Sequence, residues 1–377
     1  MAVITQKKIE FIDLRAQQDR IRENLRKRIE TVLDHGQYIM GPEIGELERR
    51  LAEYVGVKHC VSCSSGTDAL LLALMAYGVG PGDAIFTTPF TFIATAEVIS
   101  LLGATTVFVD IDAGTFNIDP GKLQAAIQDL KKRKPELRPR GIIPVDLFGQ
   151  PADYDEISAI ATAEGLFVLE DAAQSFGAVY KGRKAGSLAD VAATSFFPAK
   201  PLGCYGDGGA VFSNDDSLAE AMRSIRVHGK GVDKYDNVRI GINGRLDTLQ
   251  AAILLAKLEV LDEELALRDQ VAMRYSDALK HVVTTPLVKP DRTSVWAQYS
   301  VLSDKRDDLM KKLKARGVPT AIYYPKPLHL QGAFASLGFV NGDFPLSEEC
   351  AARIFSLPMH PYLSIDEQKH IIESLVD

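Results

Sequence analysis

The chain has 377 residues, of which 46% are hydrophobic, and its formal net charge at neutral pH is −7. This length exceeds one ordinary small core, so we expect two domains, and the negative charge argues against broad nucleic-acid binding. Residues 1–10 contain no apolar signal segment, and no run approaches the ~18 apolar residues of a membrane span. We therefore expect a cytoplasmic protein that does not engage a membrane.

Short apolar runs alternate with helical patterns through the first half of the chain, which predicts an α/β fold with a mainly parallel sheet covered by helices. The predicted strands are 84–87, 106–109, 141–145, 167–169, 194–197 and 210–212. The apolar spacing from Leu246 to Leu261 predicts one long helix, after which a smaller α+β domain is expected. The predicted domains are thus 1–261 and 262–377.

The four cysteines suggest reduced thiols rather than a disulfide framework. Cys60 and Cys63 form a CxxC pair, but they lie in a predicted strand, and Cys204 and Cys350 are far away in sequence. Redox or zinc chemistry favours an exposed turn or two further ligands close by. We interpret the pair as structural and expect no metal site.

Lys200 lies where an apolar predicted strand leads into a turn and several glycines. A lysine amine becomes a nucleophile when burial or a nearby cation lowers its pKa, and the preceding apolar residues favour this. Asp171 ends another apolar strand, while Gly66 and Thr67 open a predicted helix over 68–76 whose N-terminal N–H groups favour an anion. An imine-forming lysine, an acid for a ring nitrogen and a phosphate cradle together fit pyridoxal phosphate.

Each of these residues alone has a plainer interpretation. A lysine before proline is commonly a turn residue, an acid at a strand end is commonly a cap, and a Ser-Ser-Gly-Thr run is a common helix start. The combination in this order favours the cofactor, and Ser195 could add its hydroxyl to the phosphate site.

Together these segments resemble the sugar aminotransferases of the DegT/DnrJ/EryC1/StrS family over essentially the whole chain. The resemblance implies an aspartate-aminotransferase-like fold (fold type I of the PLP enzymes). It makes Lys200 the Schiff-base lysine and Asp171 the partner of the pyridine nitrogen. The other implied cofactor contacts are Gly66, Thr67 and Ser195 at the phosphate, Gln174 near the ring hydroxyl, Phe92 against the ring, and Asn243 at the phosphate of the neighbouring subunit. A homodimer with shared active sites is therefore implied, while Phe92 could equally be a core residue.

Residues 202–210 lack the Thr-Gly-Glu-Gly-Gly type of run that is usual in members that aminate C4, and they resemble the C3-aminating group. Within that group the chain is similar to the UDP-2-acetamido-2-deoxy-3-oxo-glucuronate aminotransferases of surface-polysaccharide pathways such as lipopolysaccharide O-antigen synthesis. Arg245 would then face a substrate carboxylate, or alternatively form a salt bridge at a subunit interface. Tyr323 and His329 belong to a Pro-rich loop that either closes over the substrate or is a plain surface loop.

The implied reaction has two stages, in which L-glutamate leaves as 2-oxoglutarate and the 3-oxo group of the sugar becomes an amine, with Lys200 as the base. A dTDP-3-oxo-6-deoxyhexose or a 4-oxo sugar remains an alternative substrate. Ketosugar dehydratases of this family replace the lysine by His, and a nicotinamide dehydrogenase requires a glycine-rich turn that residues 65–67 do not provide. A non-enzymatic PLP-binding regulator would not need the pair Lys200 and Asp171.

Overall fold

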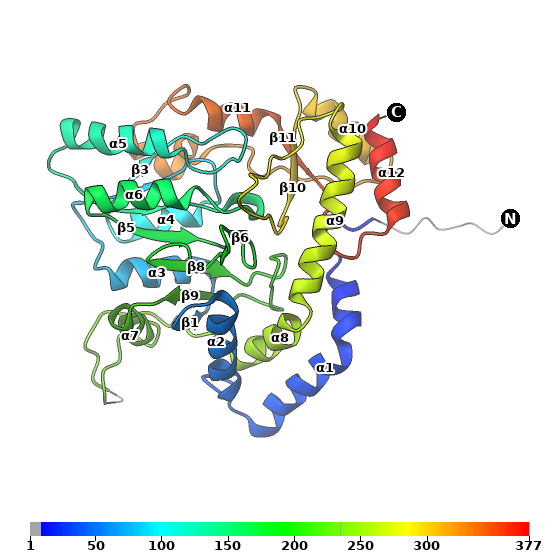
Figure 1. The fold of residues 1–377 in the computed structure, drawn as a ribbon. Coiled ribbons are helices and arrows are strands. Elements are labelled where there is room, and N and C mark those ends of the chain that lie inside the picture. The colour runs from blue at the N-terminus through cyan, green and yellow to red at the C-terminus, as the bar shows by residue number, and fades with distance from the viewer. Residues whose placement is uncertain (1–8, 234, 377) are drawn as a thin grey trace.

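The computed structural model describes residues 9–233 and 235–376, so most of the N-terminal segment considered for hydropathy lies outside the described residues. A seven-stranded sheet organises the first part of the chain, in the order β1-β9-β8-β5-β4-β2-β3 (Figure 1). Its strands are β1 (His59–Cys63), β2 (Asp83–Thr87), β3 (Thr105–Phe108), β4 (Arg138–Ile143), β5 (Phe167–Asp171), β8 (Val191–Ser195) and β9 (Gly209–Ser213).

Every predicted strand overlaps an observed one, and the predicted mainly parallel sheet is confirmed. Only β9 runs antiparallel to its neighbours β1 and β8 within this sheet, whereas β3, β2, β4, β5 and β8 pair in parallel. Strands β2, β5 and β9 are buried along their whole length, as expected for a parallel-type sheet with both faces covered. The strand predicted at 194–197 ends earlier, because Phe197 leaves the sheet and is exposed just before Pro198.

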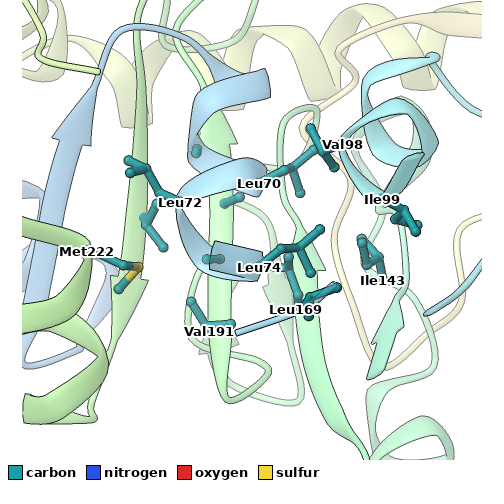
Figure 2. Close-up of a cluster of buried hydrophobic side chains, with 14 of the residues drawn as sticks. Leu70, Leu72, Leu74, Val98, Ile99, Ile143, Leu169, Val191 and Met222 are labelled. Atoms are coloured by element: carbon teal, nitrogen blue, oxygen red, sulfur yellow. The ribbon is translucent and has the colours of Figure 1, made fainter. Parts of the chain in front are cut away.

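Helices cover both faces of the sheet. On one face lie α3 (Gly66–Ala76), α4 (Ala94–Leu101) and α7 (Asp216–Ile225), and on the other α5 (Pro120–Arg133) and α6 (Tyr154–Glu164). Figure 2 shows how α3 packs: its leucines contact Leu169 and Val191 of the sheet, Val98 of α4 and Met222 of α7. These buried apolar contacts fix the start of α3 against the sheet.

Two further helices, α2 (Pro42–Val55) and α8 (Thr248–Leu258), pack beside β1 and β9, and α1 (Leu14–His35) lies along α8. A small hairpin, β6 (Val179–Tyr180) and β7 (Arg183–Lys184), and three short 3-10 turns, η1 (Leu147–Gly149), η2 (Leu328–Leu330) and η3 (Gly332–Leu337), complete the connections. Among the described residues, none of the helices combines the length and apolar character needed to span a membrane.

The C-terminal part contains a separate two-stranded sheet of β10 (Tyr299–Leu302) and β11 (Ile354–Leu357). Its helices are α9 (Leu261–Leu279), α10 (Arg306–Ala315), α11 (Pro345–Arg353) and α12 (Ile365–Val376). Helix α9 begins in the core of the large sheet with Leu261 and ends in the core of the small one with Leu279. The domain boundary near residue 261 stays a prediction.

The prediction of one long helix between Leu246 and Leu261 is wrong, because the chain forms α8 and α9 with a break at Glu259 and Val260. Leu246 precedes α8 and is buried in the same cluster as Leu254 and Leu261. The apolar spacing therefore reports burial against one core, which continues across the break although the helix does not.

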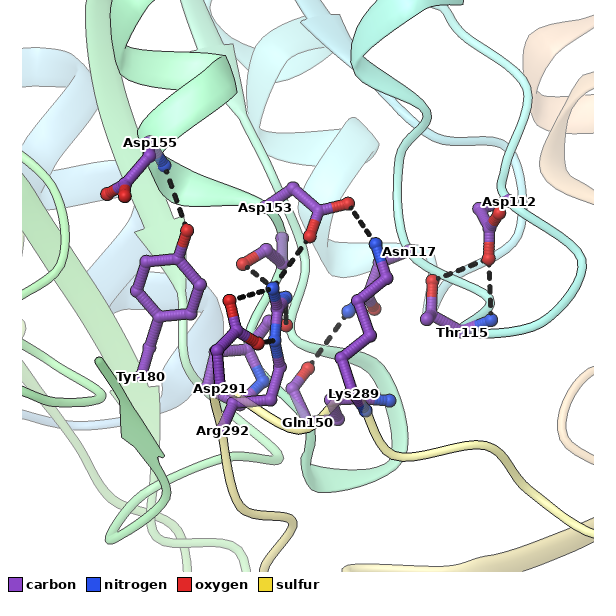
Figure 3. A network of polar contacts seen from close by, with 12 residues as sticks. Asp112, Thr115, Asn117, Gln150, Asp153, Asp155, Tyr180, Lys289, Asp291 and Arg292 are labelled. Carbon is purple, nitrogen blue, oxygen red and sulfur yellow. Dashed lines mark hydrogen bonds and ion pairs between the residues drawn. The ribbon is translucent and has the colours of Figure 1, made fainter. Parts of the chain in front are cut away.

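Arg292 ties a loop of the C-terminal part to the segment that leads into α6 (Figure 3). Its guanidinium donates to the carbonyl oxygens of Pro151 (2.8 Å) and Ala152 (2.9 Å) and pairs with Asp153 at 2.8 Å. The Arg292 side chain is only 3% exposed. Because a buried arginine with satisfied donors holds its partners in one geometry, this contact fixes the two parts of the chain relative to each other.

Candidate active site

The predicted phosphate cradle is formed where α3 begins beside the end of β8. Ser65 caps the helix, and the first N–H groups of a helix, here of Gly66 and Thr67, have no partner inside it. A Cβ on Gly66 would lie 2.6 Å from the Cβ of Ser195, and a Cβ on Gly209 would lie 2.3 Å from the Ser65 carbonyl oxygen. Only glycine at these two positions lets the helix start approach the Ser195 hydroxyl, which creates an anion-binding arrangement.

Lys200 follows β8 in a turn closed by its own N–H, which donates to the Phe197 carbonyl oxygen at 2.9 Å. Desolvation lowers the pKa of the Lys200 amine to about 8, and the nearby Asp171 charge partly opposes this shift. An amine with such a pKa is available as a nucleophile near neutral pH.

Asp171 ends β5 and is 5% exposed. The Thr95 hydroxyl donates to one carboxylate oxygen at 2.8 Å, and the Ala173 N–H donates to the other at 3.2 Å. Burial raises the pKa of Asp171, while these hydrogen bonds and the Lys200 charge act against the rise. A buried acid held in one orientation beside an amine is suited to hold a proton on a ring nitrogen.

Phe92 lies just before α4 and is 55% exposed, although its neighbours Phe90 and Thr91 are buried. Its side chain is therefore not a core side chain in this chain. The ring centroid lies 6.3 Å from that of Tyr324. An exposed phenyl face in this position is suited to stack against a planar ring.

The Gln174 amide is held in one orientation by two contacts. Its oxygen accepts a hydrogen bond from the Phe148 N–H at 2.6 Å, and its nitrogen donates to the Tyr324 hydroxyl at 3.2 Å. Sequence reasoning missed both Phe148 and Tyr324. The only signal for Tyr324 in the sequence is its position next to Tyr323. The Tyr323 side chain is half-buried, and its ring centroid lies 6.4 Å from that of Phe11.

His329 does not join this group of residues. It is 1% exposed, its ring nitrogen Nε2 lies 3.0 Å from Glu348, and its ring packs 4.7 Å from Phe344. The loop that carries it is anchored by Leu328, whose N–H donates to the Pro89 carbonyl oxygen. The predicted substrate contact of His329 stays a prediction, and its present contacts are structural.

Asn243 and Arg245 lie in the long connection between α7 and α8. The Arg245 guanidinium donates to the Asn243 side-chain oxygen at 3.1 and 2.7 Å. Asn243 is exposed and Arg245 is half-buried. Their exposure leaves both side chains open to a second subunit or to a ligand.

Cys60 and Cys63 are buried on opposite faces of β1, one in the cluster with Phe212 and the other in the cluster with Val211. Burial raises the pKa of both thiols. Neutral, buried thiols that face apart are packing residues, in agreement with the structural interpretation of the CxxC pair.

These residues suit a phosphate-bearing cofactor that forms an imine with a lysine, and comparison with known proteins gives the family. A model of the DegT/DnrJ/EryC1/StrS aminotransferase family matches residues 19–376, and the chain belongs to that family. It is 53% identical over 370 residues to the UDP-2-acetamido-2-deoxy-3-oxo-D-glucuronate aminotransferase of Pseudomonas aeruginosa, covering 98% of this chain and 100% of that protein.

Solved structures agree with this family. A DegT DnrJ EryC1 StrS aminotransferase from Brucella abortus superimposes with a TM-score of 0.95 and 52% identity, covering 97% of this chain and 98% of that one. Bacillus subtilis NtdA with bound PMP superimposes with a TM-score of 0.88 and 29% identity, covering 100% of this chain and 86% of that one. The protein is therefore an aminotransferase of fold type I that uses pyridoxal 5′-phosphate, and these predictions are confirmed.

Proposed function

We propose that the protein transfers the amino group of L-glutamate to the 3-oxo group of a UDP-linked 2-acetamido-2-deoxy-3-oxo-hexuronate, in the synthesis of a surface polysaccharide. The observation that carries this proposal is the 53% identity to the Pseudomonas aeruginosa enzyme over nearly the full length of both chains. The segment 202–210, which follows Lys200, supports amination at C3 rather than C4.

In this proposal Lys200 is the proton carrier. The cofactor, when bound, supplies a carbonyl carbon that carries the amino group and a ring that withdraws electrons. The free Lys200 amine, whose pKa burial lowers to about 8, removes the α-proton of glutamate and later delivers a proton to C3 of the sugar. Its tether in the turn after β8 keeps it within the site throughout.

The other side chains bind the cofactor and fix its orientation. Asp171, fixed by Thr95 and by the Ala173 N–H, holds the proton on the ring nitrogen. The N–H groups of Gly66 and Thr67 and the Ser195 hydroxyl bind the phosphate, and Phe92 covers a face of the ring. The unpartnered N–H groups at the start of α3 match the charge of the phosphate, the desolvated Lys200 amine matches the aldehyde, and the buried Asp171 matches the protonated ring nitrogen.

We further propose a homodimer in which Asn243 reaches the phosphate of the other subunit. Exposed apolar side chains surround this connection: Val238 and Ile240 lie on it, and Ile39 pairs with Asp247 at its end. Such a gathering of exposed apolar residues favours a protein interface. This surface supports a second copy of the chain as the partner that completes the site.

Arg245 is proposed to bind the C6 carboxylate of the uronate, because a guanidinium pairs with a carboxylate through two parallel hydrogen bonds. A dTDP-linked 3-oxo-6-deoxyhexose, the alternative substrate, has no such carboxylate. The two substrates therefore make opposite demands on this one side chain.

The test measures 2-oxoglutarate released from glutamate with the UDP-3-oxo-uronate and with the dTDP-3-oxo-6-deoxyhexose, using the wild type and Arg245→Gln. We expect the wild type to prefer the uronate and Arg245→Gln to lose at least tenfold in kcat/KM for that substrate only, about 1.4 kcal/mol. Equal losses on both sugars would assign Arg245 to the subunit interface, and a preference for the deoxyhexose would overturn the proposed substrate.

A further inference from the structure

Two carboxyl groups lie behind Asp171, on the other side of the sheet. Glu170 precedes Asp171 in β5 and so points to the opposite face, and Asp146 follows β4. Both side chains are 0% exposed. The proposed reaction uses neither of them.

Asp146 forms hydrogen bonds with the segment before α6, with the turn after β5 and with the end of β5. Its carboxyl group accepts hydrogen bonds from the Ala152 N–H (2.9 Å), the Tyr154 hydroxyl (2.8 Å) and the Ser175 hydroxyl (2.7 Å). Its own N–H donates to the Asp171 carbonyl oxygen at 3.1 Å. Asp146 is thus bonded both to the backbone of Asp171 and to the turn that follows it.

Glu170 accepts hydrogen bonds from the Gly186 N–H (2.6 Å) and the Leu188 N–H (3.0 Å). The parallel pairing of Val145 with Asp171 places Glu170 beside Pro144, two residues before Asp146, so the two acidic side chains lie on the same face, and the Asp146 charge raises the pKa of Glu170. Two ionised carboxylates buried side by side repel each other and lose their hydration, so one of the two keeps a proton unless a cation replaces it.

The surroundings provide no cation to replace that proton. Within residues 9–233 and 235–376, no ion pair includes Asp146 or Glu170. Arg292 binds the Ala152 carbonyl oxygen but pairs with Asp153, and the Lys200 charge acts on Asp171. Tyr154 and Asp171 also face the pair, and burial raises the pKa of Asp146 to about 7 and that of Glu170 well above its usual value.

We propose that Asp146 and Glu170 share one proton and act as a positioning pair for Asp171. The proton limits the negative charge buried beside Asp171, which leaves Asp171 as the ionised acid that faces the cofactor. The Ser175 contact of the same pair holds the turn that carries Gln174. This inference rests on the proposed role of Asp171.

The first test measures how many protons the protein takes up when it folds. A carboxyl group whose pKa is higher in the folded state than its unfolded value of ~3.9 stabilises the fold at low pH, and this contribution is lost as the pH rises toward about 7. Urea unfolding of the PLP-loaded wild type between these pH values reports the protons bound on folding. Asp146→Asn, which mimics a protonated acid, should bind one proton fewer, and Asp153→Asn is the control because its carboxylate pairs with Arg292.

An unchanged proton count in Asp146→Asn would overturn the shared proton, whatever the enzyme's activity. If Asp146→Asn does not fold, Glu170→Gln serves instead, and the infrared carbonyl band of a protonated buried carboxyl should be present in the wild type and absent in this variant. An infrared band that persists in Glu170→Gln would also overturn the proposal that Asp146 and Glu170 share a proton. Because both readouts are independent of turnover, their failure is distinguishable from failure of the proposed reaction.

The second test measures the effect on Asp171 through the visible spectrum of the bound cofactor. Ionisation of Asp146 near pH 7 adds a negative charge beside Asp171, which should appear as an inflection when the wild-type spectrum is followed against pH. Asp146→Asn should lack this inflection and Asp153→Asn should retain it. Identical titration curves for the wild type and Asp146→Asn would show that the pair does not act on Asp171.

Discussion

Replacing Gly66 by alanine tests the phosphate cradle. The new Cβ would lie 2.6 Å from the Ser195 Cβ and 3.0 Å from its hydroxyl oxygen. Because carbon atoms pack at about 3.5–4.0 Å, the start of α3 has to move outward by roughly 1 Å. A shift of this size lengthens the hydrogen bonds from the first helical N–H groups to a phosphate beyond their useful range.

Each such charge-assisted hydrogen bond is worth about 1.5–3 kcal/mol, so Gly66→Ala should bind pyridoxal phosphate about 10- to 100-fold more weakly. Overpacking should also lower the free energy of unfolding by about 1–3 kcal/mol. Gly45→Ala is the matched control, since a Cβ on Gly45, inside α2, meets nothing within 4 Å. It should gain up to ~1 kcal/mol in helix stability and leave the affinity unchanged.

The assay is a fluorescence or absorbance titration of each apo-protein with pyridoxal phosphate, alongside urea unfolding. The cradle would be refuted if Gly66→Ala bound the cofactor within about threefold of the wild type. An equal loss of affinity in Gly45→Ala would also count against it, because the effect would then not be local to Ser195.

Two other consequences can be measured. Arg292→Ala removes a buried ion pair and two hydrogen bonds to carbonyl oxygens, and should lower the free energy of unfolding by about 3–5 kcal/mol. Arg183→Ala, which changes an exposed side chain, should lower it by less than about 1 kcal/mol. Similar losses for the two variants in urea unfolding would contradict the proposed role of Arg292 in joining the two parts of the chain. Only the neutral Lys200 amine reacts with pyridoxal phosphate. The rate of imine formation by the apo-protein should therefore rise about tenfold per pH unit below pH 8 and level off above it. A rate that does not change with pH in stopped-flow measurements would contradict the lowered pKa of Lys200.

The sequence predicted the parts of the site that local chemistry determines. A capping serine before glycine predicts the start of α3, and the apolar strands that precede Asp171 and Lys200 predict where those residues emerge from the sheet. In a parallel sheet these strand ends meet at one edge, so their proximity follows from the strand order.

Contacts that depend on how distant segments pack could not be predicted in this way. The hydrogen bond between Gln174 and Tyr324 joins residues 150 positions apart. The contact between Asp146 and Glu170 depends on the alignment of β4 with β5. A histidine in a Pro-rich loop is typical both of a ligand-binding residue and of a buried residue paired with an acid. The sequence does not distinguish the two, and in the structure His329 packs on Phe344 and contacts Glu348.

The break between α8 and α9 has the same origin. Leucines on both sides of Val260 face a common core, so their spacing continues although the helix axis does not. Periodicity measures which face is buried, and it carries no information on whether consecutive turns belong to one helix.

The central claim, that Lys200 carries the chemistry of a glutamate-dependent aminotransferase, is tested most directly by absorption spectra with pyridoxal phosphate before and after addition of glutamate. The account predicts a visible band in the wild type that glutamate converts to the spectrum of the amine form of the cofactor, and no such band in Lys200→Ala. A band that persists in Lys200→Ala, or one that glutamate leaves unchanged in the wild type, would contradict it.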